Sequence, residues 1–252
     1  MADASTLLDR SGVHDDWRDI LQSALTSLQP DYVDSLLRDA NWLPGSERLL
    51  AAFKRDRAGV RYLLIGESPY PRAESANGIA FYDAAVGQLW SDQGLSKAVN
   101  RATSLRNIVK TALLAEGHLQ RDEDGKITQD AIARLDKRAL IQSLPELFDN
   151  LEHAGFLMLN ATPVLHPARK PAVEARYWTD FLEQLLTLIA QQSPQRITLL
   201  LWGKIAGLVE AMAASAQFDK IVCEHPYNIS FIDNPDMLRL FAELKVLQKK
   251  AW

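Results

Sequence analysis

The sequence predicts an α/β fold built on a central, largely parallel sheet of four strands. Short apolar runs, most of them ended by a glycine or a polar residue, occur at 61–66, 155–160, 196–203 and 220–223. Runs of this length are typical of strands that are buried on both faces of a parallel sheet. The segments between them repeat their apolar residues with a helical period. This alternation of strand and helix is the pattern of an α/β domain.

Helices are expected before, between and after these strands. The first covers 16–28, where the apolar side chains fall on one helical stripe that starts at Trp17. Further helices are expected at 46–53, 104–116, 145–154, 177–191, 204–214 and 235–249. The charged stretch 120–129 is expected to be a surface loop. No repeat or linker interrupts the pattern, so we expect one domain over residues 1–252, with a helical N-terminal part at 1–55.

The composition limits the class of protein. The chain has 252 residues, of which 47% are hydrophobic and 24% charged, which suits a sizeable core and not a disordered chain. Its single cysteine, Cys223, cannot close an internal disulfide, and no cluster of Cys with His indicates a metal site. The first residues lack the bases of a signal peptide, and no apolar run approaches the roughly 20 residues that span a bilayer. We therefore expect a cytoplasmic protein that needs no membrane, metal or cofactor.

Charge is distributed unevenly along the chain. The net charge is −4, but the first 50 residues hold nine acidic residues against four arginines, so the remainder is slightly basic. Residues 97–110 carry Lys97, Arg101, Arg106 and Lys110 and no acid. Such a run is either a solvated helix face or a contact surface for phosphates, and the sequence leaves both interpretations open.

Polar residues follow each predicted strand, where ligands of open α/β sheets bind. These segments are 66–70 together with 77–81, 159–163, 201–203 and 224–230. The first looks like the nucleophile turn of a serine hydrolase. However, Pro69 follows Ser68 and has no N–H for an oxyanion hole, so we exclude that class. No glycine pattern of a phosphate-binding loop follows a strand either.

Together these segments resemble the uracil-DNA glycosylase superfamily, and its family 1 in particular. Residues 66–71 (Gly-Glu-Ser-Pro-Tyr-Pro) are similar to the family's Gly-Gln-Asp-Pro-Tyr-His, and 78–82 (Gly-Ile-Ala-Phe-Tyr) to its Gly-Leu-Ala-Phe-Ser. Residues 157–161 (Leu-Met-Leu-Asn-Ala) resemble Leu-Leu-Leu-Asn-Thr, and 225–230 (His-Pro-Tyr-Asn-Ile-Ser) resemble His-Pro-Ser-Pro-Leu-Ser. The resemblance covers most of the chain. It implies a three-layer α/β/α fold and an enzyme that flips a base out of DNA and cuts it from its sugar.

The resemblance implies three base-binding residues. Phe81 would stack on the flipped base, although without the motif it would be assigned to the core. Asn160 would hydrogen-bond the Watson–Crick edge, and because an amide can turn over, it could read uracil or, reversed, cytosine. Tyr70 would form the pocket wall at the C5 edge of a pyrimidine, where it would disfavour bulky C5 groups.

The resemblance also implies a catalytic histidine and a set of DNA contacts. His225 would donate a hydrogen bond to O2 of the departing base and so stabilise the negative charge that develops there. Ile229 would be the apolar wedge that fills the vacated stack. The remaining implied DNA-binding residues are Ser104, Arg106, Tyr227 and Ser230.

The first motif departs from the family at its catalytic aspartate, which is Ser68 here. Serine carries no charge at neutral pH and is a poor base. We predict that Glu67 replaces it, because another branch of the superfamily carries its acid at this position. Glu74 and Asp83 are further candidates in the same segment.

We therefore expect a DNA glycosylase that excises uracil or another modified pyrimidine. A hypermodified, phage-type base is included, and its removal would mean antiviral defence rather than repair. The alternative is a catalytically silent homologue that binds DNA or a flipped base without cleavage. A third interpretation is an α/β protein that binds a free nucleobase or a protein partner. For the enzyme and the silent binder the expected partner is DNA, single- or double-stranded, and the expected state is a monomer.

Overall fold

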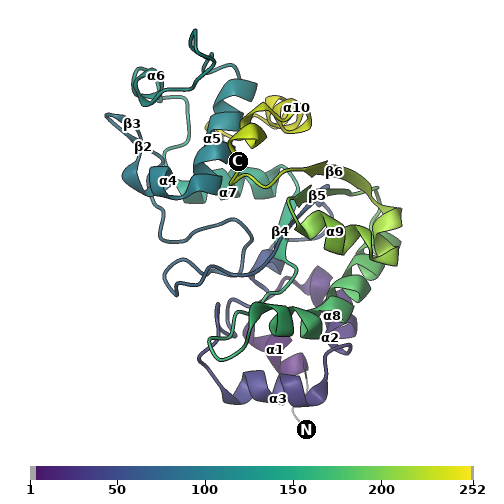
Figure 1. The fold of residues 1–252 in the computed structure, drawn as a ribbon. Coiled ribbons are helices and arrows are strands. Elements are labelled where there is room, and N and C mark those ends of the chain that lie inside the picture. The colour runs from purple at the N-terminus through teal and green to yellow at the C-terminus, as the bar shows by residue number, and fades with distance from the viewer. Residues whose placement is uncertain (1–3, 251–252) are drawn as a thin grey trace. The chain divides into compact units, whose positions relative to one another are not determined.

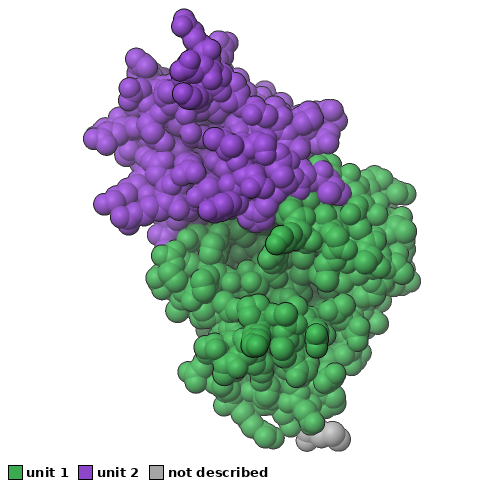
Figure 2. Space-filling view, in the orientation of Figure 1, with its two compact units in different colours: residues 1–84, 155–221 green, residues 85–154, 222–252 purple. Residues whose placement is uncertain are grey.

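The computed structural model describes residues 4–250 (Figure 1). The chain divides into two compact units (Figure 2). Residues 1–84 and 155–221 form the first unit, and residues 85–154 and 222–252 form the second. Each unit is therefore assembled from stretches that are distant in the sequence.

The first unit is built on a four-stranded sheet with the strand order β4-β1-β5-β6. Its strands are β1 (Tyr62–Gly66), β4 (Phe156–Asn160), β5 (Thr198–Trp202) and β6 (Asp219–Cys223). The last two residues of β6 belong to the second unit. β1 is parallel to both of its neighbours. The predicted α/β fold with a largely parallel sheet of four strands is confirmed.

The burial of the strands differs from the prediction at one edge of the sheet. β1, β4 and β5 are buried almost throughout, as expected for strands covered on both faces. β6 has no buried residue, and Val222 is 44% exposed, so the prediction of a fully buried strand is wrong there. β6 is an edge strand of the sheet, and it contains the polar residues Asp219 and Lys220. At the opposite edge, the N–H of Ala80 donates to the carbonyl of Met158 in β4, so a loop covers that strand.

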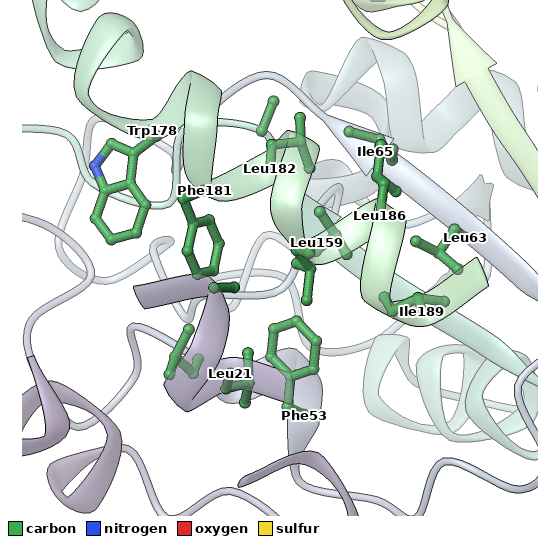
Figure 3. Close-up of a cluster of buried hydrophobic side chains, with 14 of the residues drawn as sticks. Leu21, Phe53, Leu63, Ile65, Leu159, Trp178, Phe181, Leu182, Leu186 and Ile189 are labelled. Atoms are coloured by element: carbon green, nitrogen blue, oxygen red, sulfur yellow. The ribbon is translucent and has the colours of Figure 1, made fainter. Parts of the chain in front are cut away.

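One face of the sheet packs on helices α2 (Arg18–Leu25) and α8 (Pro171–Gln192). In Figure 3, Leu63 and Ile65 of β1 lie near Leu186 and Ile189 of α8, all within one buried cluster. α8 is longer than the helix expected at 177–191 because it begins at Pro171. Proline suits the first turn of a helix, where an N–H would have no intrahelical partner.

The N-terminal part is helical, but in short pieces. α1 (Ser5–Arg10) and α3 (Pro30–Arg38) flank α2, and the start of the expected 16–28 helix is a 3₁₀ turn, η1 (Asp15–Trp17). The prediction of a helix at 46–53 is wrong. That segment forms turns that end in a 3₁₀ helix, η2 (Ala51–Phe53), and the N–H groups of Arg48 and Ala51 bond carbonyls three residues earlier. Leu49, Leu50 and Phe53 of this segment are buried in the hydrophobic core, whereas Glu47 and Arg48 are exposed.

The second unit holds most of the remaining helices. They are α4 (Lys97–Arg101), α5 (Thr103–Ala115), α6 (Gln129–Ala133), α7 (Leu144–His153), η4 (Ile229–Asp233) and α10 (Pro235–Leu244), and a short ribbon joins β2 (Trp90–Ser91) to β3 (Gly94–Leu95). α5 packs against both α10 and η4. α5 and α7 confirm the helices predicted at 104–116 and 145–154, and a reciprocal capping box between Ser143 and Glu146 starts α7.

Two predicted helices end early. In place of 204–214, the first unit has α9 (Ile205–Glu210) followed by a 3₁₀ helix, η3 (Ala213–Gln217). The closing helix, predicted to reach 249, stops at Leu244 because Lys245 takes a left-handed conformation with φ 51°. No helix among residues 4–250 is long and apolar enough to cross a membrane.

Candidate functional site

The carboxyl ends of β1 and β4 meet at one edge of the sheet. Gly66 stands opposite Asn160 in the parallel register. Beyond the strands, the N–H of Ala161 donates to the carbonyl of Gly66 at 2.8 Å, and that of Thr162 donates to the carbonyl of Glu67 at 3.0 Å. The two loops that follow the strands therefore stay paired, which fixes the positions from which their side chains project.

The loop 77–82 carries Phe81 and is anchored on the outer edge of β4. Asn77 accepts the N–H of Ile79 at 3.0 Å, and Ala80 donates to Met158 at 3.2 Å. Phe81 has φ 63°, a left-handed conformation that costs a side-chain-bearing residue about 1 kcal/mol. Its ring contacts Trp202 at the end of β5 edge-on, with ring centroids 4.9 Å apart. The surrounding bonds hold Phe81 in this unfavourable conformation, which is common at functional sites.

Gly66 brings Phe81 and Asn160 close together. A Cβ at position 66 would lie 2.7 Å from Oδ1 of Asn160 and 3.6 Å from the ring of Phe81. Asn160 is only 7% exposed, yet within residues 4–250 its side-chain amide makes no hydrogen bond. The amide has no partner among the described residues but still reaches the surface, so its donor and its acceptor are available to a ligand.

Tyr70 lies beside the same loop, with its hydroxyl directed at the carbonyl of Phe81 at 3.4 Å. Burial, together with the nearby carboxylate of Asp83, raises the pKa of Tyr70 to about 12. Asp83 is itself 4% exposed and forms an ion pair with Arg72 at 3.1 Å. Tyr70 is therefore an uncharged wall at any physiological pH, and Asp83 is engaged with a cation.

The acidic residues considered as replacements for the family's aspartate have different surroundings. Glu67 and Ser68 directly follow β1 and are both exposed, and the Glu67 side chain makes no hydrogen bond to any described residue. Glu74 is also exposed, whereas Asp83 is buried. Glu67 is thus the free carboxylate that lies next to Gly66 along the chain.

In the second unit, a loop at 224–230 presents His225 and two exposed apolar side chains. Nδ1 of His225 accepts the N–H of Tyr227 at 3.1 Å. In a neutral imidazole this leaves the proton on Nε2, so the ring is set as an Nε2–H donor. Ile229 is 79% exposed and Tyr227 is 67% exposed, so two large side chains lie in solvent on this loop.

Glu224 ties the start of this loop to the start of α10. The carboxylate of Glu224 accepts a hydrogen bond from the amide of Asn234 at 3.3 Å. Polar groups near this carboxylate, its own N–H foremost, outweigh its partial burial and hold the pKa of Glu224 below the usual range. Asn234 also accepts N–H groups in the first turn of α10, so it connects the loop to that helix.

The basic run 97–110 falls on α4 and α5. Arg106 donates to the carbonyl of Asn100 at 2.8 Å, and Lys110 donates to that of Ile127 at 2.9 Å. Burial and the neighbouring charges of Arg106 and Arg121 lower the pKa of Lys110, so these cations lie close together. Ser104 lies half-buried in the first turn of α5. Arg106 and Lys110 are thus neighbouring cations that are both hydrogen-bonded to backbone carbonyls.

Cys223 precedes this loop and has an unusual thiol. Burial, with the charges of Glu224 and Asp236, raises its pKa to about 12. At pH 8 we expect iodoacetamide to alkylate it about 100-fold more slowly than the same thiol in the chain unfolded in urea, since little thiolate is present. Mass spectrometry of timed samples measures both rates, and equal rates would contradict the burial seen here.

No group of three or more His, Cys, Asp or Glu side chains among residues 4–250 could hold a metal ion.

The structure thus gathers the predicted residues into two sets. Tyr70, Phe81 and Asn160 lie together in the first unit, where Glu67 follows Gly66. The other predicted residues all belong to the second unit: His225, Tyr227, Ile229 and Ser230 in one loop, and Ser104 and Arg106 on α5. Sequence reasoning missed the contact of Trp202 with Phe81 and the role of Gly66. The available signal in the sequence was a glycine at the end of one predicted strand and an asparagine at the end of another.

The chain matches no protein-family model. It is 24% identical over 207 residues to the uracil-DNA glycosylase of Corynebacterium glutamicum, which covers 81% of this chain and 76% of that protein. The crystal structure of mimivirus uracil-DNA glycosylase is 16% identical, covers 89% of this chain and 71% of its own and superposes with a TM-score of 0.57, which shows a shared fold.

Another solved structure is much more similar to this chain. The crystal structure of UNG from Nitratifractor salsuginis is 38% identical, covers 98% of this chain and 97% of its own, and superposes with a TM-score of 0.91. A point variant of that protein matches equally well, with 37% identity and a TM-score of 0.91. The predicted three-layer α/β/α fold is confirmed by this agreement. Identity at this level over nearly the whole length establishes that the chain belongs to the uracil-DNA glycosylase superfamily of DNA glycosylases.

Proposed function

We propose that this DNA glycosylase excises uracil from DNA by hydrolysis of the bond between the base and its sugar. The observation that carries the proposal is the nearly buried Asn160 amide, which makes no hydrogen bond within residues 4–250 and lies at Gly66 together with the ring of Phe81. Flipped bases are bound in this way, with an aromatic ring on one face and hydrogen bonds along the Watson–Crick edge.

The amide of Asn160 offers a donor and an acceptor side by side, which complements O4 and N3–H of uracil. The ring of Phe81 would stack on the base, and the neutral phenol of Tyr70 would border C5. A wall at C5 favours uracil over thymine and over 5-substituted pyrimidines. Removal of a hypermodified, phage-type base is therefore the second choice of substrate.

In the proposed reaction, the bond from C1′ to N1 breaks and its electron pair remains on the departing base. His225 would donate its Nε2–H toward O2 and so stabilise that negative charge. Water attacks C1′ and leaves a hydroxyl on the abasic sugar, and the proton that water loses is accepted by a base. We assign this base to Glu67, whose carboxylate would also offset the positive charge of the sugar.

The DNA contacts are assigned to the second unit. Ile229 would fill the gap left by the flipped nucleotide, because it is a large apolar side chain that is 79% exposed on the loop of His225. Tyr227 would contact the strand beside it. Ser104, Arg106 and Ser230 would hold phosphates, and binding is then expected to weaken with salt. We further expect the protein to act as a monomer in the cytoplasm.

The test is abasic-site formation on single- and double-stranded oligonucleotides that contain uracil, hypoxanthine, or 5-substituted or glucosylated cytosine. Cleavage of uracil substrates is expected. Glu67→Gln is expected to slow single-turnover excision about 10²- to 10³-fold, with DNA binding little changed. Glu74→Gln is the matched control, because it removes another exposed carboxylate from the same segment. A loss in the control alone would assign the base to Glu74.

Ser68 supports a second candidate function, a homologue that binds DNA without cutting it. An exposed serine hydroxyl stands where the family's aspartate is expected. Salt-sensitive binding to uracil-containing DNA with no abasic product on any of these substrates would establish this alternative and reject the assignment to Glu67.

A further inference from the structure

Asn107 is a buried side chain of α5 that contacts the loop carrying His225. It is 3% exposed, and its Nδ2 lies 2.7 Å from the carbonyl oxygen of Pro226 and 3.3 Å from that of Asn228. A side-chain amide has two N–H donors, so one group satisfies both carbonyls. The carbonyls lie on either side of Tyr227, at the turn of the loop.

The same turn sets the orientation of His225. The N–H of Tyr227 donates to Nδ1 of His225, and the N–H of Asn228 donates to the His225 carbonyl at 2.9 Å. These local bonds hold only while the peptides on both sides of Tyr227 keep their direction. Pro226 is buried, so its carbonyl would lose a partner that water cannot readily replace if Asn107 were absent.

We propose that Asn107 is a positioning residue that clamps the loop at Pro226 and Asn228, so that the His225 donor and the Ile229 side chain are presented in one fixed arrangement. Asn107 follows Ser104 and Arg106 on α5. The clamp therefore joins the helix assigned to phosphate contacts directly to the loop assigned to catalysis and to insertion. The effect on excision rests on the proposed function, whereas the effect on the loop does not.

The chain offers a matched control in Asn150 of α7. Asn150 is also 3% exposed, and its Nδ2 donates to the carbonyls of Val246 and Gln248 at 2.7 and 2.8 Å. The chemistry of the two asparagines is the same, and both lie in the second unit. Of these two asparagines, only Asn107 bonds the loop 224–230. A comparison of their alanine variants therefore distinguishes the general effect of losing a buried amide from the specific effect of losing the bonds to this loop.

The first measurement uses the free protein and needs no activity. In Asn107→Ala we expect faster hydrogen exchange at the Tyr227 amide, and imidazole nitrogen shifts that report a mixture of His225 tautomers. In Asn150→Ala both signals should match the wild type. Unchanged signals in Asn107→Ala would overturn the clamp, even if the protein proved to cleave no substrate at all.

The second measurement is single-turnover excision from uracil-containing DNA. Asn107→Ala is expected to lower the rate about 10- to 100-fold, as for a misplaced catalytic group, with a much smaller change in DNA affinity. Asn150→Ala should leave the rate within about twofold. Asn107→Asp keeps the shape, and its defect should shrink as the pH falls, because a protonated carboxyl regains one donor. Equal losses in Asn107→Ala and Asn150→Ala would overturn the proposal.

Discussion

Replacing Asn160 with alanine is expected to lower uracil excision about 10³-fold while leaving the protein as stable as the wild type, or more stable. Removing both hydrogen bonds to the base edge, with a loss of that size in rate, corresponds to about 4 kcal/mol of transition-state stabilisation. In the free protein the amide is 7% exposed and has no hydrogen bond to any described residue, so its removal takes no bond from the folded state. Opposite changes in activity and stability are typical of groups that serve a ligand.

Single-turnover excision and urea unfolding of the same preparations test this prediction. Asn150→Ala provides the contrast, because its amide bonds two carbonyls and its loss should lower the free energy of unfolding by about 1–3 kcal/mol without affecting excision. A clear loss of stability in Asn160→Ala would show that the amide has a structural role. Unchanged excision would place base recognition elsewhere.

Replacing Gly78 with alanine is expected to lower the free energy of unfolding by about 3–5 kcal/mol. Its Cβ would lie 1.8 Å from the carbonyl oxygen of Arg48, and that oxygen belongs to the backbone and cannot rotate away. Gly78 also has φ +86°, a conformation that alanine adopts only with strain. The loop 77–82 would have to move, and Phe81 with it, so the fraction that still folds should also excise more slowly.

Gly12 allows the cost of backbone strain to be measured without the cost of a steric clash. It has φ +60°, but no atom lies within 4 Å of the position that a Cβ would take. Gly12→Ala is therefore expected to cost only the backbone strain, about 1 kcal/mol. Urea denaturation of both variants measures the difference. If Gly78→Ala costs no more than Gly12→Ala, the close packing of the loop on Arg48 is not what holds Phe81 in place.

The errors in the predicted elements have physical causes. The 46–53 segment has good helix formers, but it folds as a string of turns that place Leu49, Leu50 and Phe53 in the main buried cluster. The strand at 219–223 has a short apolar run, but its place at the end of the sheet leaves it exposed. In both cases the local sequence pattern is present, but the position of the segment in the fold determines its structure and burial.

Local chemistry could have predicted part of the site. The bond from the Tyr227 N–H to Nδ1 of His225 spans two residues, as does the turn at Asn77. Contacts over long separations could not be predicted. Asn107 bonds a carbonyl 119 residues away, and Gly78 faces the backbone of Arg48. Neither residue type nor spacing identifies such partners.

The sequence by itself determined the alternation of helices and strands, the positions where the strands end, and the motifs that place the chain in its superfamily. These features follow from hydrophobic period and turn chemistry, which are properties of neighbouring residues. Only the tertiary structure decided that Gly66 brings Phe81 to Asn160, that the Asn160 amide has no hydrogen-bond partner among residues 4–250, and that Asn107 bonds two carbonyls of the His225 loop. Burial and hydrogen-bond satisfaction depend on which distant segment packs against a group, and no local pattern carries that information.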